Sequence, residues 1–187
     1  MNSETPEKRS NHLLGAFKGW GFTWKGLLNN QKGEWWLFTQ LVLLAGHLLP
    51  GWPKTTPAAP PITTCFSVAG SLFLSYGLAL SIAAVFKLGA SLSPLPDPKA
   101  NARLITSGAY SYCRHPIYQA LLMLSIGVTL LLQSILHLFL LMTLSAVLIG
   151  KAKREEKKLK VIHPKYSYYL SKTPAILPRV PLLDWRE

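Results

Sequence analysis

The strongest constraint on the fold is the stretch of residues 117–149, which runs for 33 positions without a charged side chain. As one helix it would extend about 50 Å at about 1.5 Å per residue, well beyond the roughly 30 Å hydrocarbon core of a bilayer. Gln133 and Ser134 form an adjacent polar pair near its middle. We therefore expect a tight helical hairpin that turns at this pair, with arms at 116–132 and 134–150.

Two further apolar segments precede this hairpin. One lies at 35–50 between tryptophans, which favour membrane–water interfaces, and the other at 62–88, with a proline-rich loop between them. Charged residues make up 15% of the chain, whereas soluble domains contain about 25%. The sequence therefore predicts an all-α, polytopic integral membrane protein with about four transmembrane helices.

The positive charges indicate an orientation in the membrane. The net charge is +12, and ten of the twenty Lys and Arg residues follow Gly150. Five more lie in residues 1–34 and four in 87–116, whereas the proline-rich loop has one and the hairpin turn none. By the positive-inside rule, both termini and the connection 89–115 are expected on the cytoplasmic side. An anionic membrane surface fits this charge better than nucleic acid.

Two regions are expected from this pattern. Residues 1–34 form a basic aromatic arm that does not resemble a cleaved signal peptide, and residues 35–187 form the membrane domain with a cytoplasmic tail at 151–187. Cys65 and Cys113 stand alone without a CxxC spacing, so neither a metal site nor a disulfide framework is predicted.

The hairpin brings two polar motifs together at its open end. RHPIY at 114–118 opens the first arm, and KREEKKL at 153–159 follows the second. Arg114 and His115 are therefore expected to meet Glu155 and Glu156. Arg114 could bind a ligand, pair with Glu156 or anchor the helix to lipid phosphate, and the glutamates could instead form a solvated face.

Three motifs in this order resemble the isoprenylcysteine carboxyl methyltransferase family of membrane enzymes. They are GAYSYCRHPIY at 108–118, REEKKL at 154–159 and PKYSYYLSKTPAILP at 164–178. The wider group includes phospholipid methyltransferases and the C-terminal part of sterol reductases. The resemblance covers about residues 85–180 and implies S-adenosylmethionine as the cofactor.

The resemblance also implies roles for individual residues. Those expected to bind the cofactor are Ala102, Arg103, Leu104, Ile105, Tyr110, His115, Pro116, Ile117, Tyr118 and Glu155. Those expected in a closing C-terminal element are Tyr166, Tyr169, Pro174, Leu177 and Pro178. Lys151 stands where the family has a substrate-contacting arginine and lacks the bidentate geometry of an arginine, so a lipophilic acid other than a prenylcysteine, an amine or a thiol stays open as the acceptor. Ala120 replaces a common glycine.

The predicted function is S-adenosylmethionine-dependent methyl transfer to a lipophilic small molecule or lipidated acceptor at the membrane. Methyl transfer requires alignment and exclusion of water more than acid–base catalysis, which agrees with the lack of a nucleophile–base pair in these motifs. Two alternatives remain open at this point. One is an NADPH-dependent reductase related to sterol reductases, and the other is a non-catalytic adaptor that binds membrane lipid.

Overall fold

The computed structural model describes residues 24–53, 59–97 and 103–186, and these residues are helical and contain no strand. The first 23 residues of the predicted arm lie outside this part of the chain. The helices are α2 (Trp24–Asn29), α3 (Glu34–Gly46), α4 (Pro60–Leu88), the 3₁₀ turn η1 (Gly89–Ser91), α5 (Ala109–Tyr112), α6 (Pro116–Leu132), α7 (Ile135–Ile162) and α8 (Tyr166–Lys172).

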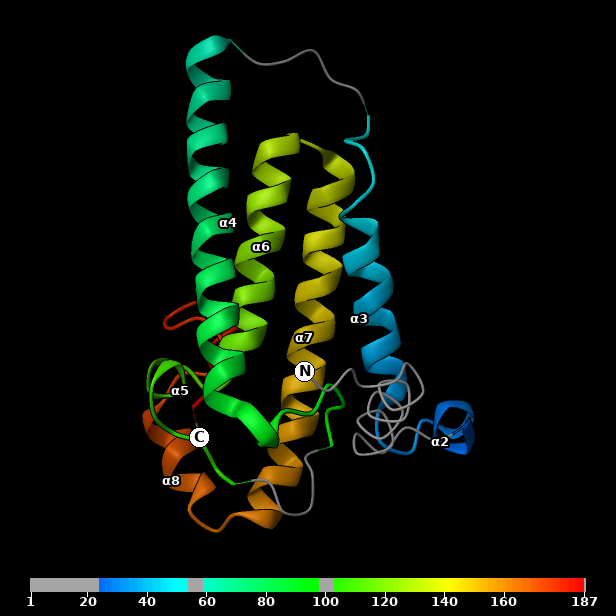
Figure 1. The fold of residues 1–187 in the computed structure, drawn as a ribbon, viewed down its shortest axis with the longest axis vertical. Helices are drawn as coiled ribbons and strands as arrows, with labels where there is room; N and C mark the ends of the chain where they lie inside the picture. Colours follow the sequence, from blue (N-terminus) through cyan, green and yellow to red (C-terminus); the bar gives the residue numbers. More distant parts are fainter. Residues whose placement is uncertain (1–23, 54–58, 98–102, 187) are drawn as a thin grey trace, which may run out of the picture.

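Four of these helices run alongside one another in the spatial order α4, α6, α7, α3 (Figure 1). The short helices α5 and α8 lie at one end of this bundle, where α6 begins and the second half of α7 emerges (Figure 1). We refer to this end as the site end. It is also where the RHPIY and KREEKKL motifs lie, so the fold brings the two polar motifs together as expected.

Helices α6 and α7 form the hairpin, and they turn at Gln133 and Ser134 as the polar pair predicts. Pro116 is at the first turn of α6, where a missing N–H costs no hydrogen bond. Gln133 ends the helix in the left-handed conformation at φ 46°. The Ser134 hydroxyl accepts from the Trp52 N–H and donates to the Trp52 carbonyl, both at 2.9 Å, which fixes the preceding loop against the hairpin tip.

Two helix boundaries differ from the expected ones. Helix α7 does not end at residue 150 but continues to Ile162, because Ala, Lys, Arg and Glu favour a helix and no proline occurs before Pro164. Helix α3 ends at Gly46 and has 13 residues, or about 20 Å of length. This is short for the segment 35–50 predicted to cross a bilayer.

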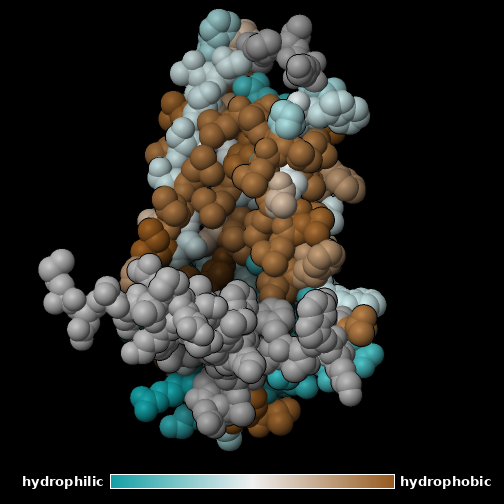
Figure 2. All heavy atoms as spheres, turned by 45° about the vertical axis from the view of Figure 1, so that its right-hand side comes forward, coloured by the Kyte–Doolittle hydropathy of each residue, from teal (hydrophilic) through white to brown (hydrophobic). Residues whose placement is uncertain are grey.

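Helices α4 and α7 are long and apolar enough to cross a membrane, and α6 is a shorter apolar helix. A broad band of hydrophobic surface covers the helices in Figure 2, with hydrophilic residues below it at the site end. Large apolar side chains such as Leu72, Phe86 and Phe139 are more than 60% exposed, as expected for surfaces that face lipid. The count of four spans and their orientation stay predictions.

Glycines set the close contact between α4 and α6. A Cβ at Gly77 would lie 2.9 Å from Leu124 Cγ and 3.0 Å from the Ala120 carbonyl oxygen. A Cβ at Gly70 would lie 2.9 Å from the Gly127 carbonyl oxygen, and the reverse holds for Gly127. Small residues of this kind allow helices in lipid to approach closely. Ala120, at the position where the resemblance implies a common glycine, is fully buried, and its carbonyl oxygen faces Gly77 in this contact.

We expect Gly77→Leu to separate α4 from α6 and lower the stability of the bundle by about 1–3 kcal/mol, the typical range for overpacking. Thermal unfolding of the purified protein in detergent, followed by circular dichroism, measures this effect. Ala79→Leu is the matched control, because Ala79 is exposed on the same helix. Equal melting temperatures for the two variants would contradict the glycine-packed contact.

Candidate functional site

At the site end, the start of α6 is fixed by the C-terminal segment. The Arg114 N–H donates to the Pro174 carbonyl at 2.9 Å, and the His115 N–H donates to the Ala175 carbonyl at 3.0 Å. Cys113, just before them, is buried, and this burial raises the pKa of its thiol to about 12. Cys113 is therefore an uncharged part of the packing, as its sequence context suggests.

All three guanidinium nitrogens of Arg114 donate hydrogen bonds to groups of the chain. Its Nε donates to Glu156 Oε1 at 2.7 Å, and its Nη2 donates to the Trp185 carbonyl at 2.8 Å. Its Nη1 donates to the carbonyls of Leu170, at 2.9 Å, and Thr173. The side chain of Arg114 is fully buried. Of the three roles considered for Arg114, the structure shows pairing with Glu156.

The two adjacent glutamates have different surroundings. Glu156 accepts from Arg114, from His115 Nε2 at 2.9 Å and from the Trp185 indole N–H at 2.6 Å, and it is buried. Glu155 is 28% exposed and accepts only from the Tyr118 hydroxyl, at 2.9 Å, among the hydrogen bonds of the described residues. His115 Nδ1 lies 3.8 Å from Glu155 Oε2. Glu156 is therefore saturated, whereas Glu155 keeps capacity for a ligand.

His115 and Tyr118 form a flat aromatic pair beside these carboxylates. Their ring centroids are 5.2 Å apart and their planes differ by 5°, so the rings are stacked. Residues three apart on a helix are neighbours on its surface. His115 lines two adjoining cavities, and Tyr118 lines one of them.

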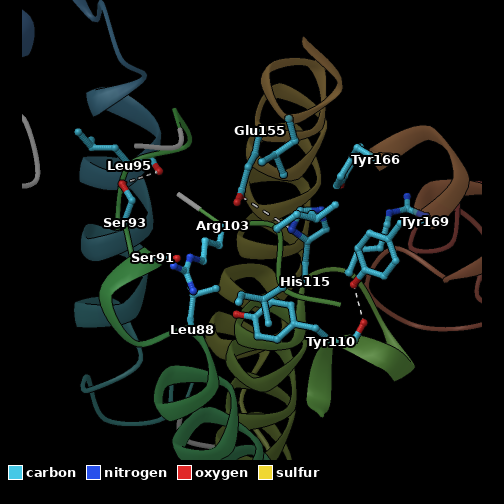
Figure 3. Close-up of a pocket in the computed structure, with 14 residues that line it drawn as sticks. Leu88, Ser91, Ser93, Leu95, Arg103, Tyr110, His115, Glu155, Tyr166 and Tyr169 are labelled. Atoms are coloured by element: carbon cyan, nitrogen blue, oxygen red, sulfur yellow. Dashed lines mark hydrogen bonds and ion pairs between the residues drawn. The ribbon is translucent and has the colours of Figure 1, made fainter. Parts of the chain in front are cut away.

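The first cavity, here called the tyrosine compartment, has a volume of about 80 Å³ (Figure 3). Glu155 points toward His115 from α7, and Tyr169 reaches Tyr110, whose carbonyl accepts the Tyr169 hydroxyl at 2.5 Å (Figure 3). Burial raises the pKa of both tyrosines and of Tyr166, so their hydroxyls stay protonated at neutral pH. Its lining comprises Leu88, Ser91, Ser93, Leu95, Arg103, Leu104, Ile105, Tyr110, Arg114, His115, Glu155, Leu159, Tyr166 and Tyr169.

The second cavity, here called the lysine compartment, has a volume of about 230 Å³ and lies among α3, α4, α6 and α7. Its lining is mostly apolar, apart from a few polar groups that include Gln40 and Lys151. The two compartments adjoin because they share six lining residues, Leu88, Ser93, Tyr110, Arg114, His115 and Glu155. Two ligands could therefore meet at the His115 and Glu155 wall.

The structure brings most of the predicted site residues to these compartments. Arg103, Leu104, Ile105, Tyr110, His115 and Glu155 line the tyrosine compartment, and Ile117, Tyr118 and Lys151 line the lysine compartment. Pro116 lines neither cavity, since it is buried at the start of α6. Ala102 lies outside the described residues.

Several residues at this site were not predicted. Ser91 and Ser93 line the tyrosine compartment from the connection after α4, and no motif marks them. Gln40 lines the lysine compartment. The one sequence signal that could have indicated this is an amide side chain within the apolar segment of α3. Arg154, three residues after Lys151, pairs with Asp97 at 3.1 Å and ties α7 to the connection that follows α4.

The profile of the phospholipid methyltransferase family matches residues 66–165, which is more than half of the chain. The chain belongs to the phospholipid methyltransferase family. Family membership supports a membrane methyltransferase and implies a methyl donor.

The chain is also similar in sequence to three curated proteins. Protein-S-isoprenylcysteine O-methyltransferase of Schizosaccharomyces pombe is 26% identical over 185 residues, which cover 91% of this chain and 78% of the relative. The nickel-cobalt-cadmium resistance protein NccN of Alcaligenes xylosoxydans xylosoxydans is 26% identical, covering 83% and 68%. The cobalt-zinc-cadmium resistance protein CzcN of Cupriavidus metallidurans is 33% identical, covering 59% of this chain and only about half (51%) of that relative. The resistance names specify no reaction.

Proposed function

We propose that this protein is an S-adenosylmethionine-dependent methyltransferase of lipophilic acceptors, most similar in activity to protein-S-isoprenylcysteine carboxyl O-methyltransferase. The observation that carries the proposal is the shared wall of the two compartments. A methyl transfer needs a donor and an acceptor in contact, and two adjoining cavities with a shared wall would bring them together.

The lining of the tyrosine compartment has chemical groups that suit parts of S-adenosylmethionine, a molecule larger than the compartment's volume of about 80 Å³. The Glu155 carboxylate can accept from an ammonium group or from ribose hydroxyls. Tyr110 and His115 offer flat faces for an adenine ring. The Tyr166 hydroxyl is buried and has no hydrogen-bond partner among the described protein atoms, so a ligand atom could satisfy it. When bound, S-adenosylmethionine supplies an electrophilic methyl group on a sulfonium.

The residues of this chain would then bind, orient and exclude water. The Tyr118 hydroxyl holds the Glu155 carboxylate in place at 2.9 Å, and stacking with His115 fixes the ring of Tyr118. The C-terminal segment 174–186 covers the start of α6 through the Arg114 and His115 backbone bonds. With the active site at the basic end of the bundle, we propose that this end and both termini face the cytoplasm.

Binding of S-adenosylhomocysteine to the full chain in detergent, measured by calorimetry, tests the proposal against its alternatives. We expect saturable binding of this demethylated product of the cofactor and none of NADPH. Binding of NADPH without binding of S-adenosylhomocysteine would favour a reductase. If neither compound binds and the protein attaches to anionic vesicles in a salt-sensitive way, an adaptor is favoured.

A matched pair of tyrosines on α5 locates the binding. Tyr110 is 7% exposed and lines both compartments, whereas Tyr112 is 80% exposed. Tyr110→Ala should weaken S-adenosylhomocysteine binding by about tenfold through loss of an aromatic face, by analogy with base stacking. Tyr112→Ala should leave the affinity unchanged in the same calorimetric measurement. Equal affinities for the two variants would place the ligand elsewhere.

A further inference from the structure

The tyrosine compartment is too small for a whole cofactor in this conformation. Its volume is about 80 Å³, whereas pockets that bind small molecules and cofactors have volumes of about 300–1,000 Å³. If S-adenosylmethionine binds here, part of the lining must move outward. The part that moves is expected to be the one that the rest of the protein holds least firmly.

Most of the lining is firmly held by other elements. The backbone N–H groups of Arg114 and His115 tie the start of α6 to the C-terminal segment. Tyr169 of α8 donates to the Tyr110 carbonyl of α5 at 2.5 Å, and Leu104 packs against the buried apolar cluster that α8 contributes. Moving any of these walls would break contacts between several elements of the site end.

The remaining wall is the connection that follows α4. Ser91, Ser93 and Leu95 border the tyrosine compartment from this connection, on the side opposite Tyr169 (Figure 3). Residues 92–97 are neither helix nor strand, and the Ser93 hydroxyl donates within the connection, to the Leu95 carbonyl at 3.3 Å. Leu95 is 3% exposed and fills space beside the cavity. Outward movement of this wall would therefore enlarge the compartment.

Asp97 holds this wall against α7. Its Oδ1 accepts from Arg154 Nε at 3.1 Å, and its Oδ2 lies 3.6 Å from Lys158 Nζ. In the described part of the chain, these are the only hydrogen bond and ion pairs that join residues 92–97 to another element. The side chains of Asp97, Arg154 and Lys158 are 18%, 31% and 54% exposed, so water and salt weaken the pairs. Such pairs can break and re-form, unlike a buried ion pair.

We infer that the connection 91–97 is a movable wall of the donor site, and that the ion pairs of Asp97 latch it in the narrow position. The inference rests on the proposed function and adds an ionic control to it, since S-adenosylmethionine binds when the latch is open. When a ligand binds only a minor state, its apparent affinity is the intrinsic affinity multiplied by the population of that state. Weakening the latch should therefore tighten binding, whereas weakening a merely structural ion pair should not.

Asp97→Asn tests this inference on the full chain in detergent micelles, with the affinity for S-adenosylhomocysteine measured by calorimetry. The substitution keeps the size of the side chain and removes its charge. We expect the variant to bind about two- to fivefold more tightly than the wild-type protein, as the strength of partly exposed ion pairs allows. Asp97→Glu keeps the charge and should bind like the wild-type protein. Equal or weaker binding by Asp97→Asn would overturn the inference.

A reciprocal variant assigns the effect to the ion pair. Arg154→Gln should also tighten binding, and combining it with Asp97→Asn should add little, because both substitutions remove the same pair. Lys157→Gln is the control, since it removes a positive charge from an exposed position on the same helix. Added salt should tighten binding by the wild-type protein but not by Asp97→Asn. Full additivity in the double variant, or an equal effect of Lys157→Gln, would refute the latch.

Hydrogen–deuterium exchange without ligand observes the wall itself. We expect the amides of Ser91, Leu92, Ser93 and Leu95 to exchange about two- to fivefold faster in Asp97→Asn than in the wild-type protein, while the amides of α6 keep their rates. Unchanged exchange of the wall, or an equal acceleration in α6, would overturn the inference.

The same samples separate the two proposals. If S-adenosylhomocysteine binds but Asp97→Asn changes neither its affinity nor the exchange of the wall, the latch fails and the proposed function stands. If the exchange shows the latch and S-adenosylhomocysteine does not bind to any variant, the methyltransferase assignment fails, and the connection remains a movable wall of the compartment.

Discussion

Replacing Glu156 with glutamine is expected to lower the stability of the site end by about 3–5 kcal/mol, the usual cost of removing one partner from a buried ion pair. Glu156 joins three elements of the chain. It accepts from Arg114 and His115 before α6 and from the Trp185 indole in the C-terminal segment. Glutamine would remove the negative charge that compensates the fully buried Arg114 guanidinium.

Limited proteolysis of the detergent-purified protein measures this change, since a released segment 174–186 is cleaved first. Tryptophan fluorescence gives a second readout, because Trp185 loses the carboxylate that accepts its indole N–H at 2.6 Å. Asp184→Asn is the control, because it removes an ion pair with Arg186 that is partly exposed. Surface pairs of this kind contribute little. Equal protease resistance of the Glu156→Gln variant and the wild-type protein would contradict the structural role of Glu156.

The sequence could predict the hairpin and the meeting of its two polar motifs. Apolar length, the pair Gln133 and Ser134, and the order of the motifs are all local signals. These signals could not predict that Glu156 is buried in an ion pair whereas Glu155 stays partly exposed. Adjacent helix residues differ by about 100° in direction, and which one meets Arg114 depends on how α7 rotates against α6. Rotation is set by tertiary packing, which no local pattern encodes.

The same limit explains the missed partners of these residues. Trp185 reaches Glu156 across 29 positions of chain, and Gln40 reaches Lys151 across 111 positions. Gly150 shows how the second contact arises, since a Cβ there would overlap the Trp36 ring. A glycine in an apolar run reads as a weak helix position from sequence alone. In the fold it allows α3 to lie close to α7 and brings Gln40 beside Lys151.

Glu155→Gln should weaken S-adenosylhomocysteine binding by about 10–100-fold, the range for losing a hydrogen bond to a charged group. Glutamine keeps the size of the side chain and its contact with Tyr118 but removes the negative charge. Because Glu155 is 28% exposed and outside the Glu156 network, the variant is expected to fold normally. His115→Ala is a less specific test, since His115 also bonds to Glu156 and its loss disturbs the buried ion pair.

Calorimetry on Glu155→Gln, alongside proteolysis of the same sample, separates binding from folding. A large loss of affinity with wild-type protease resistance is the expected result. Glu156→Gln should show the opposite result. Its C-terminal segment should be cleaved early, whereas its affinity for S-adenosylhomocysteine at low temperature should change less. Wild-type affinity in a folded Glu155→Gln protein would exclude this carboxylate as a cofactor ligand. Glu155 and Glu156 would then both have a structural role only, and the proposed binding of S-adenosylmethionine would lack a carboxylate contact.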